Sequence, residues 1–364
     1  MEHDELAAWL RLLETPQVGR VSARRLLAAF GSPQAAIAAS TAARREVVGS
    51  GPAAALADEP ETLAALIAST VDWLASGSEP RHVVTLGDPL YPATLLNIED
   101  PPLLLYALGR AELLQASSFA IVGSRNPTPQ GTDNARAFAA NLSRAGLTIV
   151  SGLALGIDGA AHDGALQGPG STVAVIGTGL DRVYPKRHLD LARRIAQQGL
   201  LVSEYPLGTP PLPENFPPRN RIIAGLARGT LVVEATLQSG SLITARLATE
   251  AGRDVFAVPG SIHSPQSRGC HALISQGAKL VESAQDILEE LQPGAAAPAS
   301  PPAEASDRPE PLLDALGYEP VSLEALVART GWSASALNTR LLELELEGRV
   351  ARLPGQLFQR IAAG

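Results

Sequence analysis

Apolar residues in the first 75 positions recur at the three- and four-residue spacing of amphipathic helices. One series lies in residues 6–13 and another in 23–30, with a turn rich in Thr, Pro and Gly at 15–19 between them. The second series ends at a Gly-Ser-Pro stop at 31–33. We therefore predict that residues 1–75 form a domain of short helices.

The central part of the chain, residues 76–292, alternates short apolar runs with segments that have room for a helix. The runs are rich in β-branched residues, as strands are. Two earlier extended pieces lie at 82–86 and 103–108. The alternation predicts a Rossmann-like, doubly wound α/β domain with a mostly parallel sheet and helices on both faces. The six predicted central strands are Phe119–Val122, Thr148–Val150, Thr172–Ile176, Leu200–Val202, Thr230–Val233 and Asp254–Val258.

The C-terminal part of the chain contains two segments that differ in composition and in predicted structure. Residues 293–311 are mostly Ala, Pro, Ser and Glu, which predicts a linker with nothing to bury. Residues 312–364 show three helical patterns and then two short extended pieces on either side of Pro354-Gly355. Three helices followed by a hairpin are the outline of a winged helix.

Composition limits the class of protein. The chain has 364 residues, of which 45% are hydrophobic, and its mean hydropathy is only +0.09. This is enough for two or three domains with real cores, and no apolar run is long enough for a membrane span. The N-terminus is acidic, unlike a secretory signal, and Cys270 is the single cysteine. We expect a cytoplasmic protein without an internal disulfide and without a membrane partner.

Charge is distributed unevenly along the chain. The net charge is −8, but 8 basic and 14 acidic side chains lie in residues 1–116, and 6 and 9 lie in 293–364. The centre, residues 117–292, has 15 basic and 14 acidic side chains. Because local clustering decides what a surface attracts, the net charge alone does not argue against a polyanion partner.

Small and polar residues follow the predicted strands. The first central strand ends in Gly123-Ser124-Arg125 and the third in Gly177-Thr178-Gly179. In open α/β sheets ligands bind beyond the carboxyl ends of the strands, where helix N-termini favour anions. Turns between strands and helices need glycine in any case, which accounts for about half of these residues. The rest predict an anion-binding crevice.

The familiar nucleotide and catalytic motifs are missing. The sequence has no GxGxxG fingerprint, no P-loop and no GxSxG elbow, so hydride transfer and nucleoside triphosphate hydrolysis lose their main support. The six histidines show no ligand spacing. We predict no catalytic residue, no cofactor and no metal site.

The most informative run contains Phe216 and Arg219-Asn220-Arg221. Arginine binds phosphate through paired N–H groups and keeps its charge. An aromatic ring beside fixed guanidinium groups suits stacking on an unpaired base. We expect these arginines to converge with Arg125 on the strand ends. The alternative is that Phe216 fills the core and the arginines pair with Glu204 or Glu234, carboxylates that we expect to hold neighbouring loops or arginines in place.

Two further segments are candidates for the same site. Ser239-Gly240-Ser241 opens the helix after the fifth central strand, and the amides of 240–242 are expected to be free for an oxygen ligand; an ordinary N-cap is the alternative. Lys186 lies in a basic turn after the third strand, where a solvated loop is the plainer explanation.

Blocks of the central region together resemble the DprA/Smf family of DNA-processing proteins. They occur in one order across about 150 residues, and the flanks agree in layout with a sterile-alpha-motif or helix-hairpin-helix domain and a winged helix. The blocks are Ala120–Arg125, Ser151–Asp158 through His162, Tyr184-Pro185, Ser203–Pro206, Phe216 with Arg219–Arg221, Ser239–Ala245 and Val258–Gly260.

The resemblance implies a protein that is not an enzyme. Members of the family bind single-stranded DNA during natural transformation, protect it and load the RecA recombinase, and they form homodimers through the Rossmann-like domain. Matched onto this chain, the implied DNA site comprises Gly123, Ser124, Arg125, Phe216, Arg219, Asn220, Arg221, Ser239, Gly240 and Ser241, with Lys186 as a weaker match.

Two other functions remain open. A related Rossmann-like class hydrolyses nucleoside monophosphates, and Glu234 would be its carboxylate, although the Pro-Gly-Gly-x-Gly-Thr run of that class is missing. A protein-binding scaffold would suit the acidic flanks. The third helix of the predicted winged helix ends in alternating glutamates at 343–347, which would repel phosphate. We therefore expect this module to contact another protein or another part of this chain.

Overall fold

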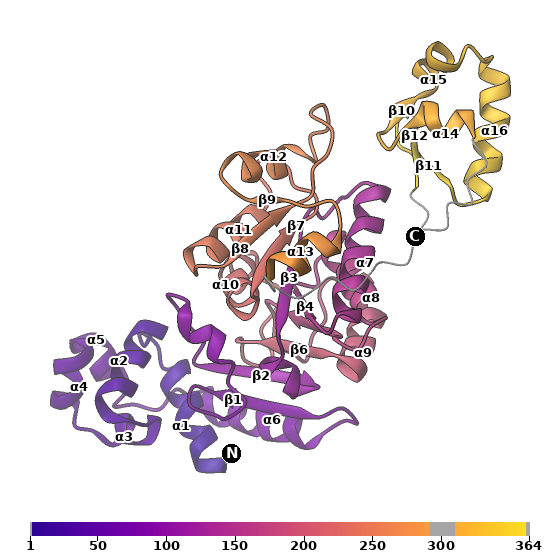
Figure 1. The fold of residues 1–364 in the computed structure, drawn as a ribbon. Helices are drawn as coiled ribbons and strands as arrows, with labels where there is room; N and C mark the ends of the chain where they lie inside the picture. The colour runs from indigo at the N-terminus through magenta and orange to yellow at the C-terminus, as the bar shows by residue number, and fades with distance from the viewer. Residues whose placement is uncertain (1, 292–309, 362–364) are drawn as a thin grey trace.

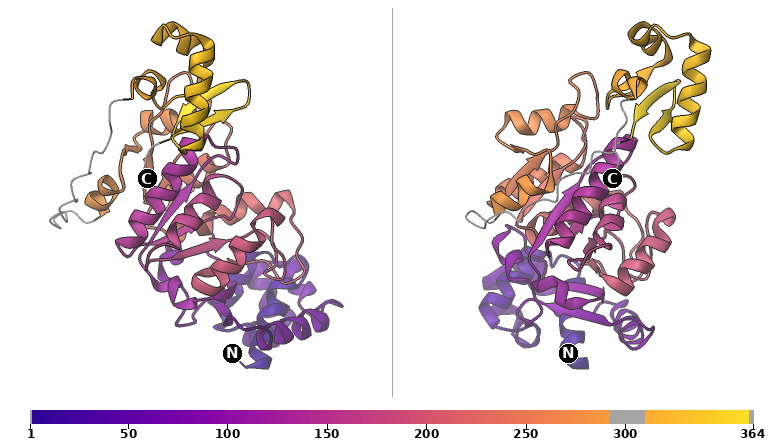
Figure 2. Two further views of the ribbon diagram at one scale, coloured as in Figure 1. Left: turned by 90° about the vertical axis from the view of Figure 1, so that its right-hand side faces the viewer. Right: turned by 45° about the vertical axis from the view of Figure 1, so that its right-hand side comes forward.

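The computed structural model of the protein describes residues 2–291 and 310–361. Within these ranges a helical part, a central α/β part and a small C-terminal part follow one another from one end of the molecule to the other (Figures 1 and 2). No helix in the described ranges has the length and apolar character needed to cross a membrane. The predicted linker lies outside the described residues except for its last two positions.

The N-terminal part consists of short helices, as predicted. Leu6, Trp9 and Leu10 of the first helix and Leu26 of the second are buried in one core. This core continues into the central part, where Trp73 packs edge-on against Tyr106 with ring centroids 6.0 Å apart. The helices are α1 (His3–Glu14), α2 (Arg20–Phe30), α3 (Pro33–Ala38), α4 (Thr41–Val48), α5 (Ser50–Ala55) and α6 (Leu63–Ala75).

The central part contains a nine-stranded sheet in the order β1-β2-β6-β5-β4-β3-β7-β8-β9. From β6 to the edge strand β9, all neighbouring strands in this order are parallel. Strand β2 is antiparallel to both of its neighbours, β1 and β6. The strands are β1 (Arg81–Thr85), β2 (Leu104–Gly109), β3 (Ser118–Val122), β4 (Thr148–Ser151), β5 (Thr172–Val175), β6 (Leu200–Ser203), β7 (Gly229–Val232), β8 (Asp254–Ala257) and β9 (Lys279–Leu280).

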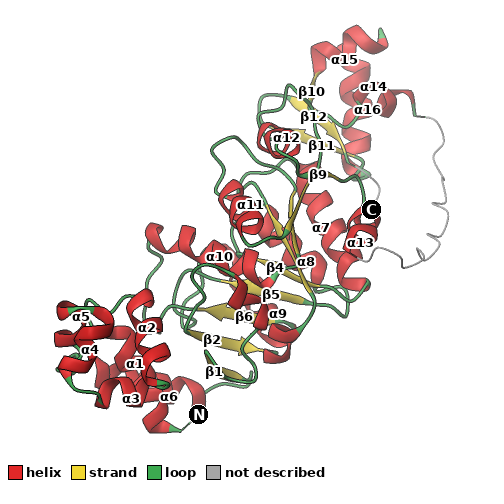
Figure 3. Ribbon diagram, turned by 60° about the vertical axis from the view of Figure 1, so that its left-hand side comes forward, coloured by secondary structure: helices red, strands yellow, loops and turns green. Residues whose placement is uncertain are grey.

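Helices cover both faces of this sheet (Figure 3). One core contains residues of α10, α11 and α12, and another contains residues of α7, α8 and α13 on the opposite face, while α9 packs with the N-terminal core. The helices are α7 (Pro129–Arg144), α8 (Ile157–Ala165), α9 (Leu189–Gln198), α10 (Phe216–Leu226), α11 (Ser241–Glu250), α12 (Arg268–Ser275) and α13 (Ala284–Leu291), with short 3-10 turns η1 (Ala93–Asn97), η2 (Ala111–Gln115), η3 (Lys186–His188) and η4 (Pro213–Asn215).

The strand order fixes where a ligand would bind. From β3 the chain first builds the sheet through β4, β5 and β6, and then returns to place β7 on the other side of β3. The crossover loops therefore diverge between the carboxyl ends of β3 and β7, which leaves a crevice there.

The C-terminal part is a winged helix with its own core, which includes Leu312, Leu326, Leu337 and Phe358. Its strands form a small antiparallel sheet in the order β10-β12-β11. Together with the mostly parallel central sheet and the N-terminal helices, this confirms the predicted fold class. The elements are α14 (Pro311–Leu316), β10 (Val321–Ser322), α15 (Leu323–Thr330), α16 (Ala334–Leu346), β11 (Val350–Leu353) and β12 (Leu357–Arg360).

Candidate nucleic-acid interface

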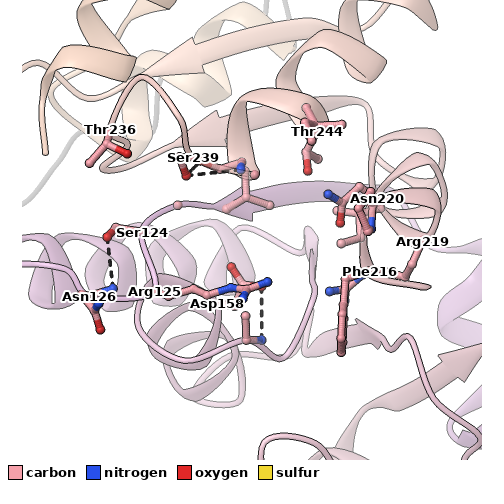
Figure 4. A pocket seen from close by; sticks show the side chains of 18 of the residues that line it. Ser124, Arg125, Asn126, Asp158, Phe216, Arg219, Asn220, Thr236, Ser239 and Thr244 are labelled. Atoms are coloured by element: carbon pink, nitrogen blue, oxygen red, sulfur yellow. Dashed lines mark hydrogen bonds between the residues drawn. The ribbon is translucent and has the colours of Figure 1, made fainter. Parts of the chain in front are cut away.

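A pocket of about 450 Å³ lies at the switch point of the central sheet, beyond the ends of β3 and β7 (Figure 4). Nine of the eleven predicted site residues line it, and Lys186 and Arg221 do not. The predicted residues that line it are Gly123, Ser124, Arg125, Phe216, Arg219, Asn220, Ser239, Gly240 and Ser241.

The loop after β3 presents Arg125 to the pocket. Ser124 is buried, its N–H donates to the carbonyl of Glu234 (2.7 Å) and its Oγ accepts from the Asn126 N–H (3.1 Å). A Cβ at Gly123 would lie 2.9 Å from the same Glu234 carbonyl, so glycine allows β3 to end this close to β7. The anchored backbone leaves the Arg125 side chain exposed at the pocket.

Arg219 forms part of the pocket wall from helix α10. Its side chain is buried, and its Nη1 donates to the carbonyl oxygens of Gly152 (2.6 Å) and Val175. Its Nε has no hydrogen-bond partner in the described structure. Burial lowers the pKa of Arg219 to about 10, and the positive charge of Arg125 acts in the same direction. The guanidinium therefore stays charged at neutral pH.

Asp158 is the acidic residue among those lining the pocket. Its Oδ2 accepts from the N–H groups of Gly152 (3.1 Å) and Ala154 (3.3 Å), which holds the turn after β4. Burial raises the pKa of Asp158, while the charge of Arg219 opposes this shift. With two arginines against one carboxylate, the pocket favours an anionic ligand.

Phe216 lies at one end of the pocket, at the start of α10 (Figure 4). Its ring is partly buried and lies 5.6 Å from the ring of Tyr184 at an angle of 38°, and the Arg219 Cζ lies 6.0 Å from its centroid. The ring thus belongs to a surface cluster beside the pocket and is not inside the apolar core. Asn220, one turn further along α10, is also partly exposed to the pocket.

At the start of α11, fewer backbone N–H groups are free than the sequence predicts. The Ser241 N–H donates to the Ser239 Oγ (3.3 Å), and the Leu242 N–H donates to the Ser239 carbonyl (3.1 Å). The expectation that the amides of 240–242 are all free is therefore wrong for 241 and 242, because a local turn satisfies them. The two serine hydroxyl groups, 2.7 Å apart, still line the pocket.

Arg221 requires a correction. Its side chain is buried on the other side of α10, where Nη2 donates to Glu204 Oε2 (2.6 Å) and Nη1 donates to Oε1 (2.7 Å). Its Nε donates to the Asp100 carbonyl (2.7 Å). The prediction that all three arginines converge on one crevice is wrong, because residues 219 and 221 of a helix point about 200° apart. The alternative pairing of Arg221 with Glu204 is what the structure contains.

Glu234 also has a supporting role. Its Oε2 accepts from the Thr128 N–H (2.9 Å) and its Oε1 from the Thr128 Oγ1 (2.6 Å), and burial raises its pKa. Lys186 is exposed in the turn η3 outside the pocket lining, so its contribution stays a prediction.

Sequence reasoning did not assign several lining residues to the site. Asp158 and Thr244 stood in quoted family blocks and could have been found there. The lining residues outside the blocks had no motif, since their loops meet only once the strand order is known. They include Asn126, Thr236 and Gln266.

The fold and pocket define a class of Rossmann-like proteins that have an electropositive pocket at the switch point and carry an N-terminal helical domain and a winged helix. The chain belongs to the DNA recombination-mediator protein A family, whose profile matches residues 82–292. The DprA winged helix domain matches residues 295–356, and the DprA-like N-terminal HHH domain matches residues 3–61. The resemblance seen in the sequence is confirmed.

Known relatives agree in sequence and in structure. Protein Smf of Escherichia coli (strain K12) is 45% identical over 299 residues, which are 79% of each chain. The X-ray structure of DNA processing protein A from Streptococcus pneumoniae superimposes with a TM-score of 0.69 at 39% identity, covering 78% of this chain and 97% of that one. DNA processing protein A from Helicobacter pylori, studied for its single-stranded DNA binding mode, gives a TM-score of 0.53 at 32% identity over 58% and 95% of the chains.

Proposed function

We propose that this protein binds single-stranded DNA without regard to sequence. The observation that carries the proposal is the placement of Arg125, Arg219 and Phe216 around one pocket at the end of the parallel strands. Guanidinium groups bind phosphates of any sequence, and an aromatic ring stacks on any base, provided that the base is unpaired. The single-stranded DNA binding mode described for the Helicobacter pylori relative supports the same function.

We infer that the protein is a binding protein and not a hydrolase of nucleoside monophosphates. The carboxylate that such a hydrolase would use, Glu234, is engaged with Thr128 and is not among the residues that line the pocket. A general base needs a free carboxylate within reach of its proton. Incubation with nucleoside monophosphates should release no free base above the rate without protein, and measurable release would revive the alternative.

Family membership supports a wider role. We propose that the protein protects incoming DNA in the cytoplasm during natural transformation and loads RecA onto it. Capture of RecA by the purified protein in the absence of DNA is the expected result, and capture that depends on DNA would argue against a direct contact.

We also propose a homodimer formed through the Rossmann-like domain. Large apolar side chains stay exposed near the β8–β9 edge, including Leu237 (59% exposed) and Leu280 (51%), as expected for surfaces that pair. Light scattering should give a mass of about twice 37.8 kDa. A mass of one chain at micromolar concentration would contradict the dimer.

The central test is binding of a fluorescent oligo-dT at several salt concentrations. We expect binding that weakens with salt along a shallow slope, with roughly −0.7 in log affinity per log salt for each phosphate contact. A duplex of the same length should bind more weakly, because its bases cannot reach Phe216. If oligo-dT does not bind at low salt, the proposed function is wrong.

A further inference from the structure

The two ends of the pocket differ in chemistry. In Figure 4, Asn126 and Thr236 lie at one end, and Phe216 and Asn220 lie at the other. A bound strand is longer than the pocket, so its phosphates and bases continue past at least one end. The surroundings of each end therefore indicate the path of the strand.

The end at Asn126 and Thr236 leads to the winged helix. A separate cavity of about 250 Å³ lies there between the central part and the winged helix, lined by Thr128, Glu234 and Glu319 among others. The carboxylate of Glu319, in the turn before β10, adds to the effect of burial in raising the pKa of Glu234. Two neighbouring carboxylates repel phosphate, so this end disfavours a continuing strand.

The end at Phe216 leads to an aromatic and basic surface. The Tyr184 ring lies 5.6 Å from the Phe216 ring, and its side chain is 49% exposed. Phe216 itself packs over Gly177, where an added Cβ would lie 3.1 Å from the ring. Lys186, two residues beyond Tyr184, is exposed in η3. A half-exposed tyrosine beside a stacking ring contributes little to a core and offers a second ring to a ligand.

We propose that the strand leaves the pocket on the Phe216 side, where Tyr184 stacks on a second base and Lys186 pairs with the following phosphate. This inference rests on the proposed single-stranded DNA binding and adds a direction and a second base site to it. Base stacking on an aromatic side chain is tolerant of sequence, so the extension keeps the site non-specific.

The test compares variants of the full chain in binding oligo-dT. Tyr184→Leu keeps an apolar side chain but removes the ring, and it should weaken binding about 5- to 30-fold. Tyr184→Phe keeps the ring and is the matched control, with affinity within about twofold of the unchanged protein. Lys186→Gln should reduce the salt slope by about 0.7. Glu319→Gln, at the other end, should leave the affinity the same or slightly tighter.

The outcomes separate this inference from the proposed function. If the unchanged protein does not bind oligo-dT, the proposed function fails. If it binds, and Phe216→Ala weakens binding while Tyr184→Leu and Lys186→Gln do not, the function stands and the path past Tyr184 is wrong. Equal losses in Tyr184→Leu and Tyr184→Phe would also overturn the stacking role, and thermal unfolding of each variant shows whether a loss comes from misfolding.

Discussion

The two sides of helix α10 use the same residue type in opposite ways. Arg219 faces the pocket, where burial lowers its pKa to about 10 and Asp158 is the lining carboxylate. Arg221 faces the N-terminal part, where burial acts to lower its pKa but the hydrogen bonds and charge of Glu204 outweigh burial and raise it. Arg221 is thus paired directly with a carboxylate, whereas Arg219 donates to the main-chain carbonyl oxygens of Gly152 and Val175.

The Arg221 side of α10 joins the N-terminal and central parts of the molecule through ion pairs. Arg20 of α2 donates to Asp100 (2.6 Å), and Arg24 of the same helix pairs with Asp100 as well. Asp100 and Glu204 thus lie between arginines of α2 and Arg221 of α10. A direct carboxylate partner therefore distinguishes Arg221, which joins two parts of the fold, from Arg219, which forms part of the pocket wall.

The largest expected effect comes from breaking the buried ion pair between Arg221 and Glu204. Glu204→Gln leaves Arg221 buried with a weaker partner, and removal of one member of a buried ion pair costs about 3–5 kcal/mol. Because the amide can still accept a hydrogen bond, we expect a loss of about 3 kcal/mol in the free energy of unfolding, measured with urea. The control is Glu112→Gln, whose exposed pair with Arg110 should contribute less than about 1 kcal/mol. Equal losses in the two variants would show that the cluster does not stabilise the fold.

A change at Arg125 in the pocket should affect the affinity for DNA and not the stability of the fold. Arg125→Ala removes an exposed charged donor from the pocket, so the affinity for oligo-dT should fall by about 1–3 kcal/mol. The salt slope should become shallower by about 0.7, and the free energy of unfolding should stay within about 0.5 kcal/mol. Arg193→Ala, on the exposed surface of α9, is the control and should bind normally. If Arg125→Ala binds oligo-dT as tightly as the unchanged protein, Arg125 is not part of the DNA site.

A change at Phe216 tests whether its ring stacks on a DNA base or only packs against the protein. Phe216→Leu keeps much of the apolar volume and removes the ring, so the affinity for oligo-dT should fall by about 1 kcal/mol or more if a base stacks there. Fluorescence of an oligonucleotide carrying 2-aminopurine reports the stacking directly. A variant with lower melting temperature but normal affinity would mean that the ring only fills space.

Much of the fold could be predicted from the sequence because strands of a buried parallel sheet are apolar along their whole length. All six predicted central strands match observed strands to within a residue or two. The strand order could not be predicted, since Val122 and Val232 are neighbours only after the chain has crossed the sheet. The position of the pocket between β3 and β7 follows from that order.

The residue types of the candidate site could be predicted, but the side of the helix on which each side chain lies could not. The pattern Arg219-Asn220-Arg221 marks two charged side chains, yet the periodicity of a helix alone does not say which face meets the pocket. The partners of Arg221, Glu204 and Asp100, come from distant parts of the chain, and only their contact in the folded structure reveals the pairing.

The smallest expected effect concerns the turn under Arg219. His162 is fully buried, its Nε2 accepts from the Leu153 N–H (3.3 Å), and burial lowers its pKa to about 3. An unfolded histidine has a pKa of about 6.5, so this neutral side chain stabilises the fold fully above that pH and progressively less as the pH falls toward 3. Between pH 7 and pH 5, the melting temperature of His162→Gln should therefore fall less than that of the unchanged protein. An identical pH dependence would show that other groups dominate acid unfolding.

The most direct test of the distinction between the two sides of α10 is a crystal structure of the protein with a short oligo-dT. We predict phosphate oxygens within hydrogen-bond distance of Arg125 and a base against Phe216, while Arg221 stays paired with Glu204. A strand that lies along Arg20 and Arg221, or on the winged helix with the pocket left free, would contradict this account.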